Sequence, residues 1–365
     1  MTDDHPSELP PPELLSRAAA PPTGAPTRAT RRAVLAGAAL AAAASALPLN
    51  RALADTWEQN KYPDPRVKSL EPAFNALRVG LAGVERLATG FRHVEGPIYF
   101  PEYRFLLFSH IPENRILKWD EETGAISTFR RPSNNANGNT RDRQGRLISC
   151  EQDTRQLTRT EYDGSITVLA THWDGKRLNS PNDVVVRSDD SIWFTDPTPG
   201  ITGWYEGHKQ EQELPTNVYR IDKTGKMTLV ADQIGPNGLA FSPNEKILYI
   251  TDGTLNPRGI SQFDVTDDGK LTNRRPFTQS ATAGPDGIKV DMNGNVWSSW
   301  GGGANDPNEQ GVRIFDPTGK PIGQIVLPER AHNIAFGGYY RNRIFMTAQQ
   351  SLYALYVNVQ GTKIA

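Results

Sequence analysis

The stretch Gly175–Pro197, GKRLNSPNDVVVRSDDSIWFTDP, contains the repeating unit from which the fold is predicted. A proline-bracketed turn leads into the β-branched run Val184–Val186, and a second polar turn separates that run from Ile192–Thr195. Two such runs joined by a short polar turn predict an antiparallel hairpin. The turn before the hairpin carries an amide and a carboxylate, Asn182 and Asp183, at the entrance of an apolar strand.

The same arrangement of a polar turn followed by an apolar strand recurs along the chain. The polar residues that open these units are Glu95, Asn137, Asn182, Asn237, Asp286 and Asn333. Subtracting successive positions gives steps of 42 to 55 residues. A period of about 40–50 residues is typical of a four-stranded propeller blade, and six units predict a six-bladed propeller.

The two ends of the repeated region predict how the ring closes. Val84–Ala88 is expected to be a lone strand before the first unit, and Ser351–Val357 the third strand of a blade without a fourth. Pairing these two strands removes open sheet edges that invite aggregation. We therefore predict an all-β, six-bladed β-propeller with four-stranded blades over residues 83–365, the last blade being closed by an N-terminal strand. Residues 55–82 are predicted to form an N-terminal arm.

Composition limits the possible partners. The 365 residues carry a formal net charge of −1 and no basic block, which argues against nucleic acid as a partner. The high content of glycine and proline fits a turn-rich all-β chain. The single cysteine, Cys150, excludes an intramolecular disulfide and is expected to be a small buried apolar group.

Residues 1–54 predict a twin-arginine signal peptide. The paired arginines Arg31 and Arg32 precede an alanine-rich apolar run that ends near Leu47, and Ala52–Ala54 matches an A-x-A cleavage pattern. The apolar run is too short and too weakly hydrophobic for a membrane span. This predicts export to a bacterial periplasm, without membrane association after cleavage. An ordinary secretory signal stays the alternative.

The repeated turns also predict a shared site. In a propeller, the loops that lead into the innermost strands gather at one end of the central channel, so their side chains should converge. The residues concerned are Glu95, Asn137 or Asn139, Asn182, Asn237, Asp286 and Asn333. Carboxylate and amide oxygens are hard ligands that suit Ca²⁺, Mg²⁺ or Mn²⁺, and the sequence has no cysteine or histidine cluster with zinc spacing. The alternative is that these residues only make hydrogen-bonded turns.

These motifs resemble those of the gluconolactonase, regucalcin and luciferin-regenerating enzyme family. Glu95-Gly96-Pro97, Leu178–Asp183, Pro236–Leu239 and Pro285–Ile288 look like its four metal-ligand motifs. The resemblance covers about residues 84 to 360 and implies a six-bladed propeller with one divalent metal in the channel. The implied cofactor is Ca²⁺ first, with Mg²⁺, Mn²⁺ or Zn²⁺ as alternatives. The implied metal ligands are Glu95, Asn182, Asn237 and Asp286. Asn137–Thr140 and Trp193–Pro197 look most like the bacterial gluconolactonase branch, whose members are often exported.

The resemblance implies hydrolysis of a sugar lactone, such as D-glucono-1,5-lactone to D-gluconate. A bound metal would polarise the lactone carbonyl, and a carboxylate would activate water. Asp286 is the implied catalytic base, and Glu95 is the second candidate. Predicted substrate-binding residues are Asn139, Arg177, Asp196, His93 and His332.

Several alternatives stay open. The same site could serve a related lactonase or a phosphotriesterase, or the protein could be a non-catalytic calcium- or sugar-binding propeller. His110 stands where the bacterial branch is expected to have an acidic residue, and either acts as an acid or base or lines the channel wall. The polar segment Thr198–Glu213 is either a lid over one face or a plain surface loop.

Overall fold

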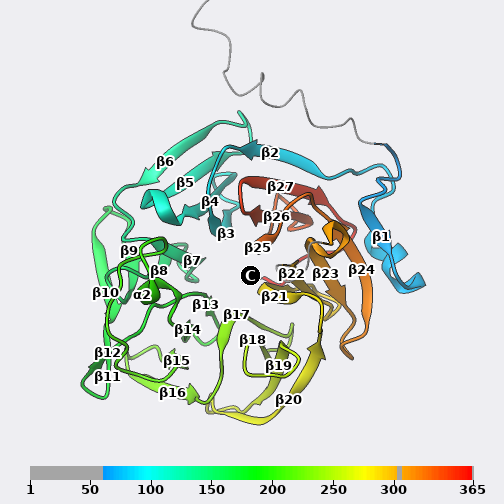
Figure 1. The fold of residues 1–365 in the computed structure, drawn as a ribbon. Helices are drawn as coiled ribbons and strands as arrows, with labels where there is room; N and C mark the ends of the chain where they lie inside the picture. The colour runs from blue at the N-terminus through cyan, green and yellow to red at the C-terminus, as the bar shows by residue number, and fades with distance from the viewer. Residues whose placement is uncertain (1–60, 302–305, 364–365) are drawn as a thin grey trace, which may run out of the picture. The chain divides into compact units, whose positions relative to one another are not determined.

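The computed structural model describes residues 61–301 and 306–363; the predicted signal peptide lies outside these residues. Within this part of the chain, six sheets are arranged radially around a central channel (Figure 1). Each of these sheets has four antiparallel strands. In one sheet the fourth strand comes from the N-terminal part of the propeller, and another sheet gains a fifth strand. The predicted six-bladed propeller with four-stranded blades is confirmed.

The strands of the first five blades run outward from the channel in chain order, and the sixth blade has the N-terminal strand outermost. The first two blades consist of β3 (Val94–Phe100), β4 (Phe105–His110), β5 (Arg115–Asp120) and β6 (Ile126–Arg130), then β7 (Ala136–Arg141), β8 (Leu147–Glu151), β9 (Gln156–Thr160) and β10 (Ile166–Ala170). The third and fourth consist of β13 (Val184–Val186), β14 (Ile192–Asp196), β15 (Asn217–Ile221) and β16 (Met227–Ala231), then β17 (Pro236–Phe241), β18 (Ile247–Asp252), β19 (Gly259–Val265) and β20 (Leu271–Gln279). The fifth consists of β21 (Gly284–Val290), β22 (Val296–Gly301), β23 (Gly311–Phe315) and β24 (Pro321–Val326), and the sixth of β25 (Ala331–Gly337), β26 (Arg343–Ala348), β27 (Ser351–Tyr356) and β2 (Glu85–Thr89).

The hairpin predicted from the opening stretch forms as expected. In β13 and β14, Val184 pairs with Phe194 and Val186 with Ile192 in an antiparallel register. The short hairpin of β11 (His172–Trp173) and β12 (Lys176–Arg177) precedes this blade, and the short helix α2 (Pro199–Thr202) follows β14. None of the helices in residues 61–301 and 306–363 has the length and apolar character needed to cross a membrane.

The ring closes between the first and last strands of the propeller. Strand β2 pairs antiparallel with β27, with Glu85 opposite Ala354 and Thr89 opposite Ser351. The last blade therefore combines both ends of the repeated region. This confirms the predicted closure and removes two unpaired edges.

The N-terminal arm adds a strand that the sequence did not predict. Strand β1 (Val67–Ser69) pairs antiparallel with β24 at the rim of the fifth blade. A short 3₁₀ helix, Pro72–Leu77, then buries Phe74 against Trp297, with 6.3 Å between the ring centroids. The arm thus covers the outer edge of one blade.

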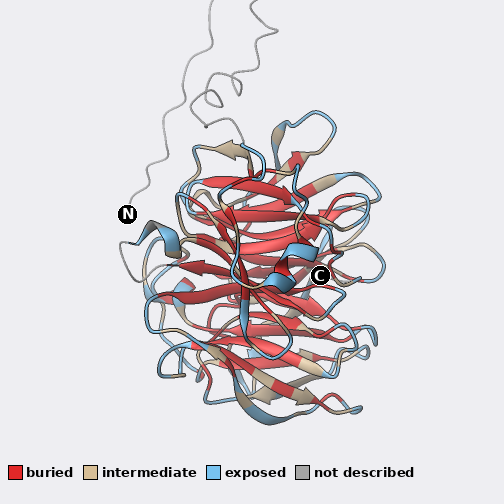
Figure 2. Cartoon of the chain, turned by 90° about the vertical axis from the view of Figure 1, so that its right-hand side faces the viewer, coloured by how far each residue is buried: buried red, intermediate tan, exposed pale blue. Residues whose placement is uncertain are grey.

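Apolar side chains fill the spaces between neighbouring blades. Six buried clusters occur among the described residues, and each joins strands of two adjacent blades. Figure 2 shows the result, with mostly buried strands and exposed connecting loops. Cys150 lies in the cluster between the second and third blades and is fully buried, as predicted. Because every cluster is shared, each blade depends on both neighbours for its core.

The closure of the ring yields a prediction for Phe345. This residue of β26 is fully buried and stacks on Tyr99 of the first blade, with 5.6 Å between ring centroids. We expect Phe345→Ala to lower the free energy of unfolding by about 3–5 kcal/mol, because it leaves a cavity where the ring closes. Urea denaturation followed by tryptophan fluorescence measures this change.

The matched control is Tyr339→Ala, which removes an exposed aromatic ring from the same blade. We expect a change within about 0.5 kcal/mol for this variant. Equal effects of the two substitutions would contradict the role assigned to Phe345.

Candidate active site at one mouth of the channel

The repeated polar residues lie at the starts of the innermost strands. Glu95 and Asp286 are near the beginnings of β3 and β21, and Asn237 has the same position in β17. Asn182 lies just before β13. Glu95, Asp286 and Asn182 are buried, and Asn237 is half-buried. Their common position at the starts of inner strands places them at one mouth of the channel.

Buried hydroxyl groups link these strand starts across the blades. In each linked pair, a hydroxyl on the second strand of one blade donates to a backbone carbonyl of the next inner strand. The bonds run from Ser109 Oγ to Asn137 O (2.7 Å), from Thr251 Oγ1 to Asp286 O (2.6 Å) and from Ser299 Oγ to His332 O (2.6 Å). They fix the backbone from which the channel-facing side chains start.

The sequence contains a signal for these hydroxyl groups that our reasoning missed. A serine or threonine recurs on the second strand of every repeat. The residues are Ser109, Ser149, Thr195, Thr251, Ser299 and Thr347. Each unit therefore repeats two positions, the polar residue at the start of the inner strand and the hydroxyl residue on the second strand. Such a second repeat indicates an interaction between neighbouring units.

Glycine after two of the polar residues permits close contact between blades. A Cβ atom at Gly96 would lie 2.1 Å from the carbonyl oxygen of Asn137, and one at Gly287 would lie 2.2 Å from Asn333 Oδ1. No side chain fits at such distances, so the motifs need glycine for packing as well as for turn geometry.

The two acidic residues at this mouth have different surroundings. Glu95 Oε2 accepts a hydrogen bond from its neighbour Gly96 N at 2.9 Å. Burial, and then the carboxylate of Asp286, raises the pKa of Glu95 well above its usual value. Burial also acts to raise the pKa of Asp286, but His332 and Arg330 outweigh it and lower that pKa. Arg330 Nη2 donates to Asp286 Oδ2 at 2.7 Å. Asp286 is therefore the carboxylate held in its ionised form.

Two histidines complete the cluster. The rings of His93 and His332 lie 4.3 Å apart between centroids, and His332 Nδ1 is 3.5 Å from Asp286 Oδ2. One ligand atom from each of His93, Glu95 and His332 lies within 4.8 Å of the other two. Burial, and then the neighbouring His332, lowers the pKa of His93 to about 3, so its imidazole is neutral near pH 7.

The residues present fit a divalent cation. Asp286 Oδ1 is buried and has no hydrogen-bond partner among the described residues, while Glu95 is a second buried carboxylate whose pKa the charge of Asp286 helps to raise. Buried carboxylates of this kind need a positive partner. Within the described part of the chain, no hydrogen bond joins the side chains of Asn182 or Asn237 to these carboxylates. Their roles as ligands stay predictions.

The segment Thr198–Glu213 reaches the same mouth. Its Glu206 Oε1 lies 3.9 Å from His93 Nδ1, and Tyr205 stacks on His93 with 6.1 Å between centroids. Burial, and then the charge of Asp286, raises the pKa of Glu206. The sequence left two interpretations of this segment, a lid or a plain surface loop, and the structure favours the lid. The sequence did not show which of its residues would face the site.

The lid is anchored on the second blade. His208 contacts the carboxylate of Asp153, and Gln210 Nε2 donates to the backbone carbonyl of Asp153 at 3.1 Å. A Cβ atom at Gly207 would lie 2.3 Å from Gly200 O, so the segment folds tightly on itself. This anchoring holds Tyr205 and Glu206 beside His93.

Three of the predicted substrate-binding residues have internal partners instead. Asn139 Nδ2 donates to Gly96 O at 2.9 Å, and its Oδ1 accepts from Ser149 Oγ at 2.7 Å. Asp196 is fully buried, and burial raises its pKa to about 7. Arg177 Nη2 donates to the backbone carbonyl of Thr154. In this structure Asn139 links the first two blades, while Asp196 Oδ2 accepts a hydrogen bond from Asn179 N at 2.8 Å beside its own blade, and both side chains are buried.

His110 is a wall residue of the first blade. It is buried, its Nε2 accepts a hydrogen bond from Arg92 N at 3.2 Å, and its ring lies edge-on to Phe91. Burial, and then the charge of Arg115, lowers its pKa to about 4. A neutral, hydrogen-bonded imidazole fits the channel-wall alternative better than an acid–base role.

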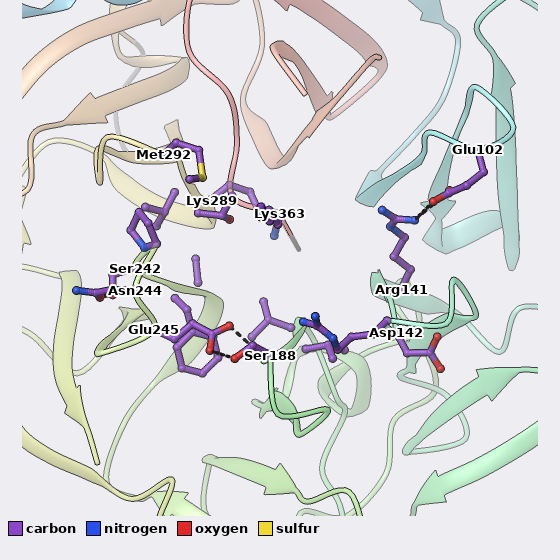
Figure 3. Close-up of a pocket in the computed structure, with 18 residues that line it drawn as sticks. Glu102, Arg141, Asp142, Ser188, Ser242, Asn244, Glu245, Lys289, Met292 and Lys363 are labelled. Atoms are coloured by element: carbon purple, nitrogen blue, oxygen red, sulfur yellow. Dashed lines mark hydrogen bonds and ion pairs between the residues drawn. The ribbon is translucent and has the colours of Figure 1, made fainter. Parts of the chain in front are cut away.

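A cavity of about 670 Å³ with polar and apolar lining residues opens at the other end of the inner strands (Figure 3). It is lined by the last residues of β7, β13, β17 and β21 and by Lys363. Two of its charged side chains lie in hydrogen bonds within the cavity: Arg141 donates to Glu102 at 2.9 Å, and Glu245 accepts from Ser188 N at 2.9 Å. The predicted site residues do not line this cavity.

Comparison with known proteins identifies the family. Residues 94–350 match the model of the SMP-30/Gluconolactonase/LRE-like region. The chain belongs to this family. A gluconolactonase of Zymomonas mobilis is 28% identical over 283 residues, which cover 71% of this chain and 77% of that protein. A pentonolactonase of Haloferax volcanii is 28% identical over 267 residues, which cover 71% and 82%.

A solved structure is also similar to this chain and supports the same family assignment. The structure of a gluconolactonase from Xanthomonas campestris has a TM-score of 0.73 and 35% sequence identity, covering 80% of this chain and 94% of that one. These relatives carry the names of enzymes that hydrolyse lactone esters. The predicted family and enzyme class are confirmed, whereas the exported branch stays a prediction.

The buried His110 yields a prediction about pH. Its folded-state pKa of about 4 lies below the ordinary value of 6.5, so protons bind the unfolded chain more tightly. The contribution of His110 to the free energy of unfolding is therefore fully present above pH 6.5 and is lost as the pH decreases toward 4. Between pH 7 and pH 5, this residue should account for about 2 kcal/mol of the lost free energy of unfolding. Urea denaturation at both pH values measures the loss.

We expect His110→Gln to reduce that loss, because glutamine does not titrate. The control is His172→Gln at an exposed histidine, which should keep the pH dependence of the unmodified protein. An unchanged pH dependence in His110→Gln would show that His110 is not the group responsible.

Proposed function

We propose that this protein is a metal-dependent lactonase that hydrolyses a sugar lactone, with D-glucono-1,5-lactone as the first candidate. The observation that carries the proposal is the buried pair Glu95 and Asp286 at the mouth of a propeller whose family relatives are named lactonases. Two neighbouring carboxylates whose pKa values shift in opposite directions are the arrangement expected for acid–base chemistry.

Asp286 is the proposed base. Its carboxylate is held ionised by Arg330 and His332, and its buried Oδ1 has no partner in the described part of the protein. That oxygen is therefore available to take the proton of an attacking water. The water oxygen adds to the lactone carbonyl carbon, and the bond from that carbon to the ring oxygen then breaks. Asp286 returns the proton it took to the departing ring oxygen, which becomes a hydroxyl group, and the carboxylic acid product releases its own proton to solvent.

The proposed metal site includes Glu95 and Asp286, with Asn182 and Asn237 at the same mouth. A divalent cation bound there would supply charge stabilisation at the lactone carbonyl oxygen. Glu95 is the second candidate for the base, and its raised pKa favours the protonated form in the absence of a cation.

The lid supplies the proposed contacts for the sugar. Glu206 and Tyr205 stand beside His93, where a carboxylate can accept hydrogen bonds from hydroxyl groups and an aromatic ring can cover an apolar sugar face. The twin-arginine pattern in residues 1–54 supports a periplasmic location for this reaction, with no membrane association after cleavage of the signal.

Hydrolysis of D-glucono-1,5-lactone tests the proposed function. Proton release is followed for the purified protein after chelation and after addition of Ca²⁺, Mg²⁺, Mn²⁺ or Zn²⁺. We expect metal-dependent turnover that Asp286→Asn lowers by about 100-fold or more, because the amide cannot accept the proton. Metal content is measured for each variant, so that loss of metal is separated from loss of the base.

Asp163→Asn is the matched control, because Asp163 caps an exposed turn through Ser165. Its turnover should equal that of the unmodified protein. Absence of hydrolysis with every metal would overturn the gluconolactone proposal. Pentonolactones and phosphotriesters are then assayed, and inactivity toward all of them with retained calcium or sugar binding would favour the non-catalytic propeller.

Glu206 yields a separate prediction for substrate binding. Removing one hydrogen bond to a charged group costs about 1.5 kcal/mol, so Glu206→Ala should raise KM about 10-fold, with kcat within about 3-fold. Steady-state kinetics on the lactone measure both parameters. The control, Glu211→Ala, changes an exposed glutamate of the same segment and should leave KM unaltered. A lower kcat at constant KM would contradict a binding role for Glu206.

A further inference from the structure

The proposed reaction does not use the cavity at the opposite mouth of the channel. Its volume of about 670 Å³ lies in the range of small-molecule sites. The ends of the inner strands of the second to fifth blades line it, together with Lys363. Figure 3 shows Lys289 and Lys363 together on one side of the cavity and Arg141 on the other. A cavity of this size with charged side chains in its wall is a candidate for a second binding site.

Lys289 occupies a position that repeats around the channel. In each blade, the inner-strand residue at this position pairs with the residue two before the repeated serine or threonine of the second strand. The six residues are Ile98, Arg141, Val185, Ala240, Lys289 and Ala335. Four of these six residues line the cavity. Arg141 and Lys289 are thus the two cations in a ring of otherwise uncharged side chains.

The two cations of this ring differ in their partners. Arg141 Nη1 donates to both carboxylate oxygens of Glu102, at 2.9 and 3.0 Å. Lys289 is 5 % exposed, and its side chain makes no hydrogen bond or ion pair within residues 61–301 and 306–363. Burial raises the pKa of Asp183, and Lys289 is near enough to oppose that rise, but no ion pair joins the two side chains. A buried ammonium group without a protein partner needs a polar or negative partner from elsewhere.

The acidic side chains in the wall of the cavity already have cationic partners. Besides the carboxylate bound by Arg141, Asp142 Oδ2 accepts from Arg146 Nε at 2.7 Å. Glu245 Oε2 lies 3.5 Å from Arg187 Nε. The exposed Lys363, in contrast, has no hydrogen-bond or ion-pair partner within the described part of the chain. The uncompensated charge of the cavity is therefore positive, which favours an anion over a cation.

We propose that this cavity binds a small carboxylate anion with hydroxyl groups, of the size of a sugar acid, through the ammonium group of Lys289. One buried ammonium group balances one negative charge. A phosphate dianion would also have to use the exposed Lys363, whose charge is screened by water and salt. Asn244 lines the same cavity, and its amide nitrogen has no hydrogen-bond partner among the described residues, so it can donate to a hydroxyl group.

The choice of a sugar acid rests on the proposed function, because hydrolysis of a sugar lactone yields such an anion. The anion site itself rests only on the cavity, its uncompensated positive charge and the unpartnered Lys289. The product of the reaction at one mouth of the channel would then have a binding site at the other mouth.

Calorimetric titration with D-gluconate tests the proposed anion site. The purified protein is first treated with a chelator, so that no cation holds gluconate at the mouth that contains Glu95 and Asp286. We expect binding in the millimolar range or tighter. Lys289→Met should weaken this binding about 10-fold or more, because the charge-assisted hydrogen bond to the carboxylate is lost. Methionine has a similar length and no charge, so the cavity wall is kept.

Three controls show whether charge, position and ligand class decide the binding. Lys223→Met replaces an exposed lysine away from the cavity and should leave the affinity for gluconate unchanged. Glucitol carries the hydroxyl groups of gluconate without its charge and should not bind. Inorganic phosphate should bind more weakly than gluconate. Equal binding of glucitol, or tighter binding of phosphate, would overturn the proposal of a carboxylate site.

A crystal structure of the unmodified protein with gluconate keeps the test independent of whether the variant folds. Gluconate beside Lys289 would support the inference, and gluconate only at the mouth with Glu95 and Asp286 would overturn it. Unchanged gluconate affinity in the folded Lys289→Met variant, or no gluconate binding at all, would overturn it as well. In the first of these cases, Lys289 would only balance the charge of Asp183.

The outcome is separate from the lactone assay of the proposed function. Gluconate bound at Lys289 in a protein that hydrolyses no lactone rejects the proposed function only. Lactone hydrolysis by a protein that binds no anion at Lys289 rejects this inference only.

Discussion

The hydrogen bond from a buried hydroxyl to the start of the next inner strand is the interaction on which the site depends. The hydrogen bonds within one blade do not set the position of its inner strand relative to the inner strand of the next blade. Ser109, Thr251 and Ser299 provide the fixed contact, and all three are 6 % exposed or less. If this hydrogen bond breaks, the buried hydroxyl and carbonyl groups cannot bond to water instead. Breaking it therefore costs free energy, and the bonded geometry is strongly favoured. The accepting carbonyls include those of Asp286 and His332, whose side chains face the channel mouth.

Repetition is the reason that the fold could be predicted. Each unit carries a polar turn, an inner strand and a second strand in the same order, and the pairing of β2 with β27 follows from counting strands and avoiding open edges. The strand β1 and the packing of Phe74 on Trp297 could not be predicted in the same way. They occur once, and they depend on contacts between residues far apart in the chain.

The site was predictable in position and less so in detail. The strand starts identified Glu95, Asp286, His93 and His332, which the structure brings together. Arg330 follows β24 and Glu206 lies in a loop without periodicity, so no local pattern placed them beside Asp286 and His93. For Asn139 and Asp196, the region was right, but the direction of each side chain depends on partners in adjacent strands. The arrangement of side chains around a channel is set by packing between blades, which a single repeat does not encode.

The charges at the mouth explain why these residues can be stable together. Glu95, Asp286 and Glu206 bring three carboxylates to one place, while Arg330 supplies one positive charge and the neutral His93 none. Burial raises the pKa values of Glu95 and Glu206, because the ionised forms of these carboxylates are poorly solvated there. A divalent cation carries two positive charges and would release protons from such groups on binding. The proposed cation would therefore compete with protons for this mouth, while Arg330 favours the ionised form of Asp286 in both cases.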